Sequence, residues 1–196
     1  MTWRERLKKW RGLPIRGDFL TLLPQGGVGA ELGVFRGEFT AELLRVAEPK
    51  ELHLIDVWWT AFGEHFPDWG AYTDHGRLST RQAYREVQAQ VARHPRVRSQ
   101  IHVGSDLDIL QQFPNKYFDW VYVDSSHTYE HTLAELEILR HKVHGLILGH
   151  DWADGPPTAD NGVAQAVQEF CTRYGYSLVQ RDKHYRQWAI KKDPVG

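Results

Sequence analysis

The sequence predicts an α/β protein with a doubly wound, mostly parallel β-sheet. The first observation is that four strand-like segments are continuously apolar, as strands buried on both faces are when helices cover a parallel sheet on each side. The second observation is that helical patterns separate these segments, and such an alternation of strand and helix is typical of α/β folds. The apolar segments are 28–35, 51–58, 118–124 and 145–151, and the helical patterns are 38–47, 81–94, 131–143 and 163–175.

The third observation concerns the C-terminal end of the chain. Residues 176–181 and 185–192 are two strand-like runs that only residues 182–184 separate. Three residues leave no room for a crossover helix, so these runs form a hairpin. We therefore expect the last strand to run antiparallel to its neighbour.

The composition indicates a single domain over residues 1–196. A chain of 196 residues can bury one hydrophobic core but is short for two domains. Its 24 basic and 25 acidic side chains give no charge excess of the kind that binds nucleic acid or anionic membranes. We expect a small-molecule or protein partner and leave a homo-oligomer open. The single cysteine, Cys171, excludes a disulfide framework and fits a cytoplasmic protein.

Residues 1–20 predict a short helical extension of the domain. Trp3, Leu7 and Trp10 fall at helical spacing with basic residues between them. A membrane-surface helix has this pattern as well, but so short a stretch is more typical of a helix that packs on its own domain. No apolar segment follows the charged residues, so we expect neither a signal peptide nor a membrane span.

A glycine-rich turn follows the first strand-like segment. Gly29, Gly33 and Gly37 flank Glu31 in the stretch GGVGAELGVFRGEFT. Glycines at a strand-to-helix turn let the backbone approach a ligand that the N–H groups of the helix then face. The pattern is not GxGxxG, so a pyrophosphate-containing cofactor is not favoured. A purely structural turn is the alternative.

Polar residues also end the next two strands. Asp56 lies 25 residues after Glu31, where a carboxylate can accept hydrogen bonds from ribose hydroxyls of a ligand across the glycine turn. Its alternative role is to cap the following segment. Ser105 and Asp106 either meet the exocyclic amine of an adenine ring or cap the helix that begins at Leu107.

This order of motifs resembles the class I S-adenosylmethionine-dependent methyltransferases. The motifs are ELGVFRG, LIDVW, VGSD, FDWVYVD, GLILGHD and the terminal hairpin, and the resemblance covers about residues 25–192. VDSSHTYE followed by GLILGHDW resembles more narrowly the small-molecule O-methyltransferases grouped as methyltransferase family 24. The resemblance implies a Rossmann-like sheet of seven strands with the last hairpin strand reversed. It also implies transfer of a methyl group to the hydroxyl of a small molecule, with assistance from a divalent metal.

The resemblance further implies where the cofactor S-adenosylmethionine is held. Its methionine end would lie along the glycine turn, its ribose at the end of the second strand and its adenine after the third. The cofactor-binding residues implied are Glu31, Gly33, Val34, Phe35, Gly37, Asp56, Ser105, Asp106 and Asp124.

Two acids at neighbouring strand ends predict a metal site. Asp124 and Asp151 each follow an apolar strand, and adjacent strand ends lie about 5 Å apart, so both carboxylates can reach one point. Such a pair needs a cation, and Mg²⁺ suits oxygen ligands. His150 would add a nitrogen ligand, which shifts the preference toward Mn²⁺ or Fe²⁺. The alternative is that the two acids organise loops and hydrogen-bond the substrate.

His127 is the candidate general base. It follows Asp124 by three residues, the spacing at which the related sugar methyltransferases carry this group. A neutral imidazole can take the hydroxyl proton of the acceptor as its oxygen attacks the methyl group. A histidine that caps the next helix is the alternative. The stretch HTYEH does not match the zinc-protease motif HExxH, because Glu130 directly precedes the second histidine.

The segment 58–80 is rich in aromatic residues and glycine and predicts a lid or acceptor-binding segment. Aromatic side chains that pack on the domain, or a dimer contact, are its alternatives. Two other functions compete with methyl transfer on this fold. One is a non-catalytic protein that binds the cofactor or a nucleoside, and the other is an iron-dependent enzyme related to hydroxylases.

Overall fold

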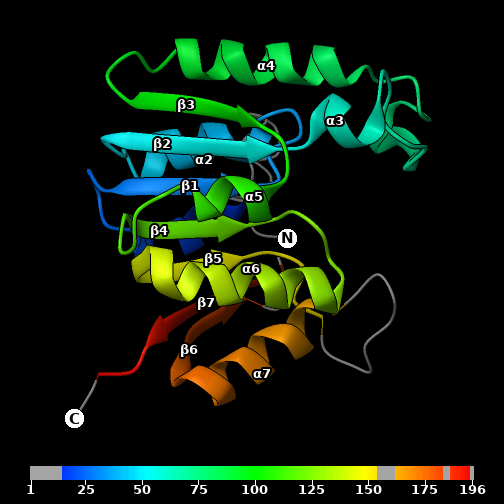
Figure 1. Cartoon of the computed structure of the whole chain (residues 1–196). Helices are drawn as coiled ribbons and strands as arrows, with labels where there is room; N and C mark the ends of the chain where they lie inside the picture. The colour runs from blue at the N-terminus through cyan, green and yellow to red at the C-terminus, as the bar shows by residue number, and fades with distance from the viewer. Residues whose placement is uncertain (1–14, 154–161, 183–185, 195–196) are drawn as a thin grey trace, which may run out of the picture.

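The structure is a computed structural model that describes residues 15–153, 162–182 and 186–194. Seven strands form one sheet in the order β3-β2-β1-β4-β5-β7-β6 (Figure 1). The strands are β1 (Val28–Leu32), β2 (Glu51–Asp56), β3 (Arg98–Val103), β4 (Phe118–Val123), β5 (Val143–Gly149), β6 (Tyr176–Asp182) and β7 (Gln187–Lys192). The predicted α/β class and the seven strands of the resemblance are confirmed.

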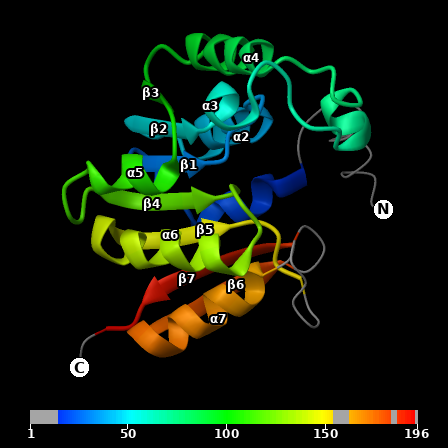
Figure 2. The same cartoon turned by 45° about the vertical axis from the view of Figure 1, so that its right-hand side comes forward.

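Strand directions follow the prediction. The pairs β1–β2, β2–β3, β1–β4 and β4–β5 are parallel. Strand β7 pairs antiparallel with both β5 and β6, so it is the one reversed strand of the described sheet. In Figures 1 and 2, β6 and β7 lie at the end of the sheet opposite to β3.

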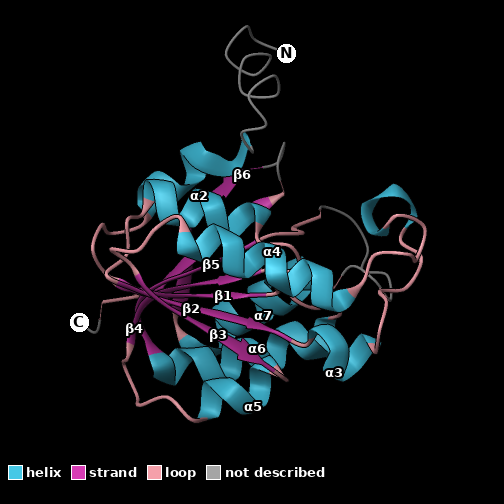
Figure 3. Ribbon diagram, turned by 90° about the horizontal axis from the view of Figure 1, so that it is seen from above, coloured by secondary structure: helices cyan, strands magenta, loops and turns pink. Residues whose placement is uncertain are grey.

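Helices cover both faces of the sheet (Figure 3). On one face, α2 (Glu38–Val46), α4 (Thr80–Ala92) and the 3₁₀ helix η1 (Ile15–Leu22) contribute Leu43, Val87 and Leu20 to one apolar cluster. On the other face, α5 (Asp106–Gln111), α6 (Tyr129–Lys142) and α7 (Val163–Tyr174) contribute to a second cluster. Burial on both faces explains why the central strands are apolar without alternation.

Two glycines in the sheet make room for buried tryptophans. A Cβ atom on Gly29 would lie 2.1 Å from the Trp120 ring, and one on Gly149 would lie 2.4 Å from the Trp188 ring. Gly29 therefore serves packing, whereas the sequence suggested that it brings backbone close to a ligand. Trp188 also donates a hydrogen bond from Nε1 to the carbonyl oxygen of His150 at 2.9 Å, which anchors the chain after β5.

The N-terminal extension is described only in part. Phe19, Leu20 and Leu23 are buried and pack in the same cluster as α2, as expected of a segment that docks on its own domain. The spacing of Trp3, Leu7 and Trp10 lies outside the described residues. None of the helices in the described part of the chain has the length and apolar character of a membrane-spanning segment.

The segment between β2 and α4 contains two short helices that the sequence did not predict. They are α3 (Trp58–Phe62) and the 3₁₀ helix η2 (Gly70–Thr73). A bridge between His65 and Ser79 closes the segment at its base. Helices this short are not stable alone. Ring contacts hold them to the domain, with Trp58 against Tyr84 of α4 and Tyr72 against Phe35.

Candidate functional site

One cleft of about 780 Å³ opens where the carboxyl ends of β1, β2, β4 and β5 meet. The chain runs outward from β1 to β2 and β3 on one side and starts again at β4 on the other side, so the boundary between β1 and β4 is the switch point of the sheet. Ligands of open α/β sheets bind at such a point. A cleft of this size accommodates a cofactor together with a small second ligand.

The glycine turn packs directly on the end of β4. Gly33 has a φ of 81°, and a Cβ atom there would lie 2.1 Å from the carbonyl oxygen of Asp124. Only glycine allows this approach, because any side chain would meet backbone. Gly37, with a φ of 77°, begins α2 and its amide donates to the carbonyl oxygen of Val34 at 2.9 Å.

Asp56 holds the glycine turn in place. Its Oδ2 accepts hydrogen bonds from the amides of Val34 at 2.8 Å and Phe35 at 2.7 Å, and its Oδ1 accepts one from Trp58 at 3.1 Å. Burial raises the pKa of the Asp56 carboxyl, although these amides oppose that shift. Asp56 lines the cleft, and its contact with a ribose stays a prediction. Its oxygens accept from backbone amides, which agrees with the alternative role of a cap.

Glu31 lies under the turn. It is 1% exposed, is not among the residues that line the cleft, and its Oε2 accepts a hydrogen bond from the Thr40 hydroxyl at 2.6 Å. Its predicted contact with the cofactor stays a prediction, and the geometry gives it a role in fixing the start of α2.

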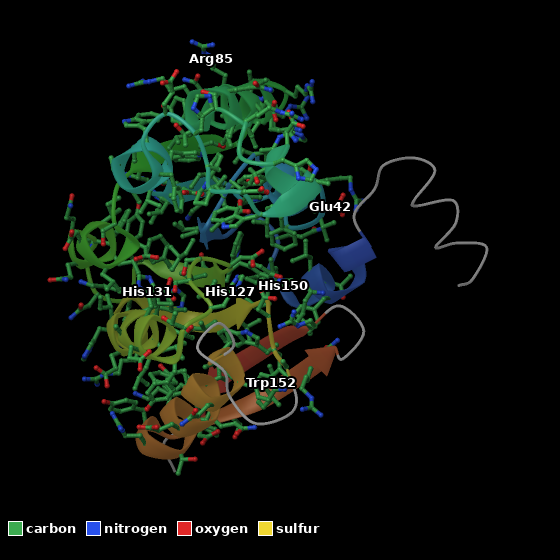
Figure 4. The ribbon with its side chains drawn as sticks, turned by 90° about the vertical axis from the view of Figure 1, so that its right-hand side faces the viewer. Glu42, Arg85, His127, His131, His150 and Trp152 are labelled. Carbon is green, nitrogen blue, oxygen red and sulfur yellow. The ribbon has the colours of Figure 1, made fainter. Side chains whose placement is uncertain are left out.

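The acids and histidines after β4 and β5 converge, as the sequence predicted. Ligand atoms of Asp124, His127 and Asp151 lie within 4.8 Å of one another. His150 Nδ1 lies 3.3 Å from Asp124 Oδ1 and 3.0 Å from Asp151 Oδ2. His127 Nε2 lies 2.7 Å from the same Asp151 oxygen. Figure 4 shows His127 and His150 beside each other, with His131 farther along the same edge.

Asp151 is the centre of this group. It has a φ of 59°, an uncommon value for a residue with a side chain, and the type of backbone strain that clusters at functional sites. Arg186 Nη1 lies 3.2 Å from its Oδ1. Burial would raise the pKa of the Asp151 carboxyl, but hydrogen bonds from His127 and His150 outweigh burial and hold that pKa below its usual value. Asp151 therefore remains ionised at neutral pH.

His127 is held by Asp151 and faces the cleft. Its side chain is 45% exposed, and its hydrogen bond to Asp151 raises the pKa of the imidazole above the ordinary value. In the described part of the chain, its Nδ1 has no hydrogen-bond partner. Thr128, rather than His127, caps α6, because its hydroxyl accepts from the amide of His131 at 3.4 Å. The cap alternative for His127 is therefore wrong.

Ser105 and Asp106 reach the cleft from the start of α5. Ser105 stands at the N-cap position, but its side chain makes no capping hydrogen bond. Asp106 Oδ1 accepts from the amide of Leu107 at 2.7 Å, and its Oδ2 lies 3.0 Å from His131 Nε2. Sequence reasoning did not assign His131 a role. His131 meets Asp106 across 25 residues of sequence, so no local spacing points to it.

The aromatic segment forms the opposite wall of the cleft. Phe62, Phe66, Trp69 and Tyr72 all line it. Tyr72 stacks on Phe35 of the glycine turn, with ring centroids 4.3 Å apart and planes at 16°. The segment therefore packs directly on the turn, and its role as a lid or acceptor-binding segment stays a prediction.

A family model described as a methyltransferase domain matches residues 30–152, well over half of the chain. The chain belongs to this family of S-adenosylmethionine-dependent methyltransferases. No curated protein sequence matches the chain.

Solved structures agree with this assignment. An O-methyltransferase from Bacillus cereus, in complex with S-adenosylhomocysteine, has a TM-score of 0.61 at 16% identity, covering 95% of this chain and 88% of that one. A methyltransferase from Aquifex aeolicus has a TM-score of 0.57 at 15% identity, covering 97% of each chain. The tRNA methyltransferase TrmK of B. subtilis has a TM-score of 0.51 at 11% identity, covering 91% and 64%. At these identities the likeness establishes the shared fold of this methyltransferase and leaves its acceptor open.

Proposed function

We propose that this methyltransferase methylates a hydroxyl group of a small molecule, with His127 as the general base. The observation that carries the proposal is the 2.7 Å contact between His127 Nε2 and Asp151 Oδ2 at the floor of the cleft, beside Asp124. Asp151 fixes the imidazole ring and favours proton uptake, while the free Nδ1 is available to the acceptor hydroxyl.

The chemical step is a displacement at carbon. When bound, S-adenosylmethionine would supply the methyl group: the acceptor oxygen would form a bond to the methyl carbon as the carbon–sulfur bond breaks and its electron pair stays on the sulfur of the product S-adenosylhomocysteine. The hydroxyl proton moves to Nδ1 of His127. Because such a reaction depends on holding the two reactants in line, the rigid glycine turn and the aromatic wall contribute through positioning.

The cofactor would lie along the glycine turn and toward α5. Gly33 and Phe35 line the cleft there, whereas Val34 is buried and its amide bonds to Asp56. Val34, Gly37 and Glu31 would therefore support the turn from behind. Ser105 and Asp106 line the other end of the same cleft, where an adenine ring would meet them. Asp56 would act through the turn and Asp124 would lie between cofactor and acceptor.

The donor set at the cleft floor fits a divalent metal. Asp124, His127 and Asp151 each offer a ligand atom within 4.8 Å of the others, and His150 Nδ1 lies 3.3 Å from Asp124 Oδ1 and 3.0 Å from Asp151 Oδ2. Asp124 and Asp151, with His150, would hold the ion, and a nitrogen in the set suits Mn²⁺ or Fe²⁺ beside Mg²⁺. A bound ion would lower the pKa of the acceptor hydroxyl. Arg186 already neutralises part of the charge of Asp151, so an ion would share that carboxylate.

The cleft favours a small acceptor without phosphate groups. Four aspartates line it, and none of its described lining residues is a lysine or an arginine. Phosphate binding relies on such cations, so a polynucleotide acceptor of the kind named for TrmK is disfavoured. The aromatic wall suits a flat acceptor ring.

A transfer assay tests the proposal. The protein is incubated with methyl-labelled S-adenosylmethionine and a panel of hydroxylated sugars and phenols, and labelled product is counted. His127→Ala should keep its affinity for S-adenosylhomocysteine and lose transfer by about 10²-fold or more, since general bases contribute on that order. Transfer at the wild-type rate by His127→Ala would overturn the assignment of the base.

Metal removal tests the ion separately. After dialysis against EDTA, we expect kcat/KM to fall at least tenfold and to recover on addition of Mn²⁺ or Mg²⁺. A rate that EDTA leaves unchanged would remove the metal from the proposal while leaving His127 in place.

A further inference from the structure

A buried carboxyl group lies between two loops that face the cleft, one after β3 and one after β4. Glu135 lies on α6 and has no exposed surface. Its Oε1 accepts a hydrogen bond from the Ser125 hydroxyl at 2.6 Å. Ser125 follows β4, and it lines the cleft although Glu135 does not.

The other side of Glu135 faces a second acid. Ligand atoms of Asp106, His131 and Glu135 lie within 4.8 Å of one another. His131 Nε2 lies 3.0 Å from Asp106 Oδ2 and 3.8 Å from Glu135 Oε1. Within the described residues, no lysine or arginine contacts either acid. His131 is the basic side chain that lies between them. Two ionised carboxylates beside a neutral imidazole would repel, and a proton on one of the two acids removes that repulsion.

Hydrogen bonding indicates which acid is protonated. Asp106 already accepts from Leu107 and His131, which favours its charged form. Glu135 Oε2 is buried and accepts from no donor. If this oxygen carried a proton, it would donate a hydrogen bond to Asp106 and would no longer lack a hydrogen-bond partner. The pKa values agree: burial and the neighbouring Asp106 raise the pKa of Glu135 well above its usual value, whereas the pKa of Asp106, which burial would raise, is lowered by hydrogen bonds from His131 and Glu135.

We propose that Glu135 is a positioning residue for cofactor binding: as an uncharged carboxyl group it donates to Asp106, accepts from Ser125, and holds the β3–α5 and β4–α6 loops at a fixed spacing. The inference deepens the proposed function, because it presumes that the cofactor binds between these loops. Glu135 touches no ligand and acts through Asp106 and Ser125.

The test is the affinity for S-adenosylhomocysteine, measured by calorimetry between pH 6 and 10 together with thermal unfolding. Glu135→Gln supplies an amide that donates to Asp106 and an oxygen that accepts from Ser125, so its Kd at pH 7 should stay within about threefold of wild type. Glu135→Leu removes both bonds, and its Kd should rise about tenfold or more. Glu130→Gln, the same substitution at an exposed position of α6, is the matched control and should bind as wild type.

The pH series separates positioning from a merely structural role. In the wild type, loss of the shared proton at alkaline pH leaves two buried negative charges, so the Kd should rise there. In Glu135→Gln no such proton exists, and that alkaline rise should be absent. This comparison needs only the glutamine variant, so it holds even if the leucine variant fails to fold.

Three results would overturn the inference. Unchanged affinity in Glu135→Leu would mean that the loops need no such link. Equal losses in the glutamine and leucine variants, with Mn²⁺ altering the wild-type affinity alone, would mean that these three side chains hold a metal instead. A rise of the Kd at alkaline pH that persists in Glu135→Gln would show that a group other than Glu135 loses the proton. No binding by the wild type at any pH would instead contradict the proposed function itself.

Discussion

Asp151 is the single residue on which the proposed chemistry depends most. Its carboxylate contacts His127, His150 and Arg186, and its backbone occupies the left-handed region to do so. A strained residue persists only where its surroundings hold it. Here the hydrogen bond from Trp188 Nε1 to the carbonyl oxygen of His150 holds the backbone next to Asp151 in place.

Asp151→Asn should move the pH dependence of transfer. His127 must be neutral to accept a proton, and Asp151 raises the pKa of its imidazole, so wild-type kcat/KM should rise with pH through that raised pKa. The amide removes the charge, so the rising limb should shift to lower pH while the plateau falls by roughly 10²-fold. Asp68→Asn, in an exposed pair with His75, is the control and should leave the profile unchanged. If the rise of kcat/KM with pH stays at the same pH in Asp151→Asn, a group other than His127 controls that rise.

Gly33→Ala should disrupt the glycine turn. Its Cβ would lie 2.1 Å from the carbonyl oxygen of Asp124, in addition to the strain of a φ of 81°. Gly26→Ala is the matched control, because Gly26 has a φ of 70° with nothing within 4 Å of an added Cβ. Backbone strain alone costs about 1–3 kcal/mol. We expect Gly33→Ala to lower the free energy of unfolding beyond the control and to abolish binding of S-adenosylhomocysteine. Equal effects of the two substitutions would contradict the close packing of the turn.

At the scale of elements, local pattern predicted the strands and main helices because burial on two faces leaves an unmistakable apolar run. The predicted first strand extended to residue 35, whereas β1 ends at Leu32. The amides of Val34 and Phe35 bond to Asp56 rather than to a neighbouring strand, and such a contact across 21 and 22 residues leaves no local pattern.

The parts of the site that escaped prediction depend on tertiary contacts. Asp106 and His131 meet across 25 residues of sequence, and Ser125 meets Glu135 from a different element. Glu135 lies in the middle of α6, and the pattern of apolar residues in that helix does not indicate that this carboxyl group is buried. By contrast, Asp124 and Asp151 were predictable, because both follow apolar strands that are neighbours in any doubly wound sheet.

Tyr72 should contribute to cofactor binding through the glycine turn. It stacks on Phe35 although its own side chain is 58% exposed, so removal should cost little stability. Stacked aromatic pairs contribute about 0.5–1.5 kcal/mol, so Tyr72→Ala should raise the Kd for S-adenosylhomocysteine about three- to tenfold. Tyr72→Phe should restore the affinity. Leu178→Ala, at an exposed apolar position on β6, is the control. An unchanged Kd in Tyr72→Ala would show that the stacking of Tyr72 on Phe35 does not contribute to cofactor binding.

At the scale of the whole molecule, the sheet brings a histidine pair into its interior. His53 on β2 is 2% exposed, and its Nδ1 lies 2.9 Å from His102 Nε2 on β3. Burial and the neighbouring His102 lower the pKa of His53 to about 4. The folded protein therefore keeps this imidazole neutral where the unfolded chain would protonate it.

Acid should destabilise the protein through this pair. Above pH 6.5 His53 is neutral in both the folded and the unfolded protein, so it does not change the free energy of unfolding. Between pH 6.5 and about 4 only the unfolded chain binds a proton at His53. Stability should fall over that range by up to about 3 kcal/mol from His53. His53→Gln should show a smaller fall between pH 7 and 5, and His141→Gln, at an exposed position, should show the full fall. Denaturant unfolding at each pH measures the free energy of unfolding. If that free energy falls equally with pH in the wild type and both variants, groups other than His53 cause the acid sensitivity.

The sheet topology determines where the cleft lies. The cleft lies at the switch point of the sheet, between the glycine turn of β1 and the acids after β4 and β5, so donor and acceptor would meet over Asp124. The most direct test is an electron-density map of crystals grown with S-adenosylhomocysteine. We expect density for the nucleoside along Gly33 to Phe35 and toward Asp106, with its sulfur directed at the group formed by Asp124, His127 and Asp151. Density at another place on the protein, or an empty cleft at saturating ligand, would contradict the account.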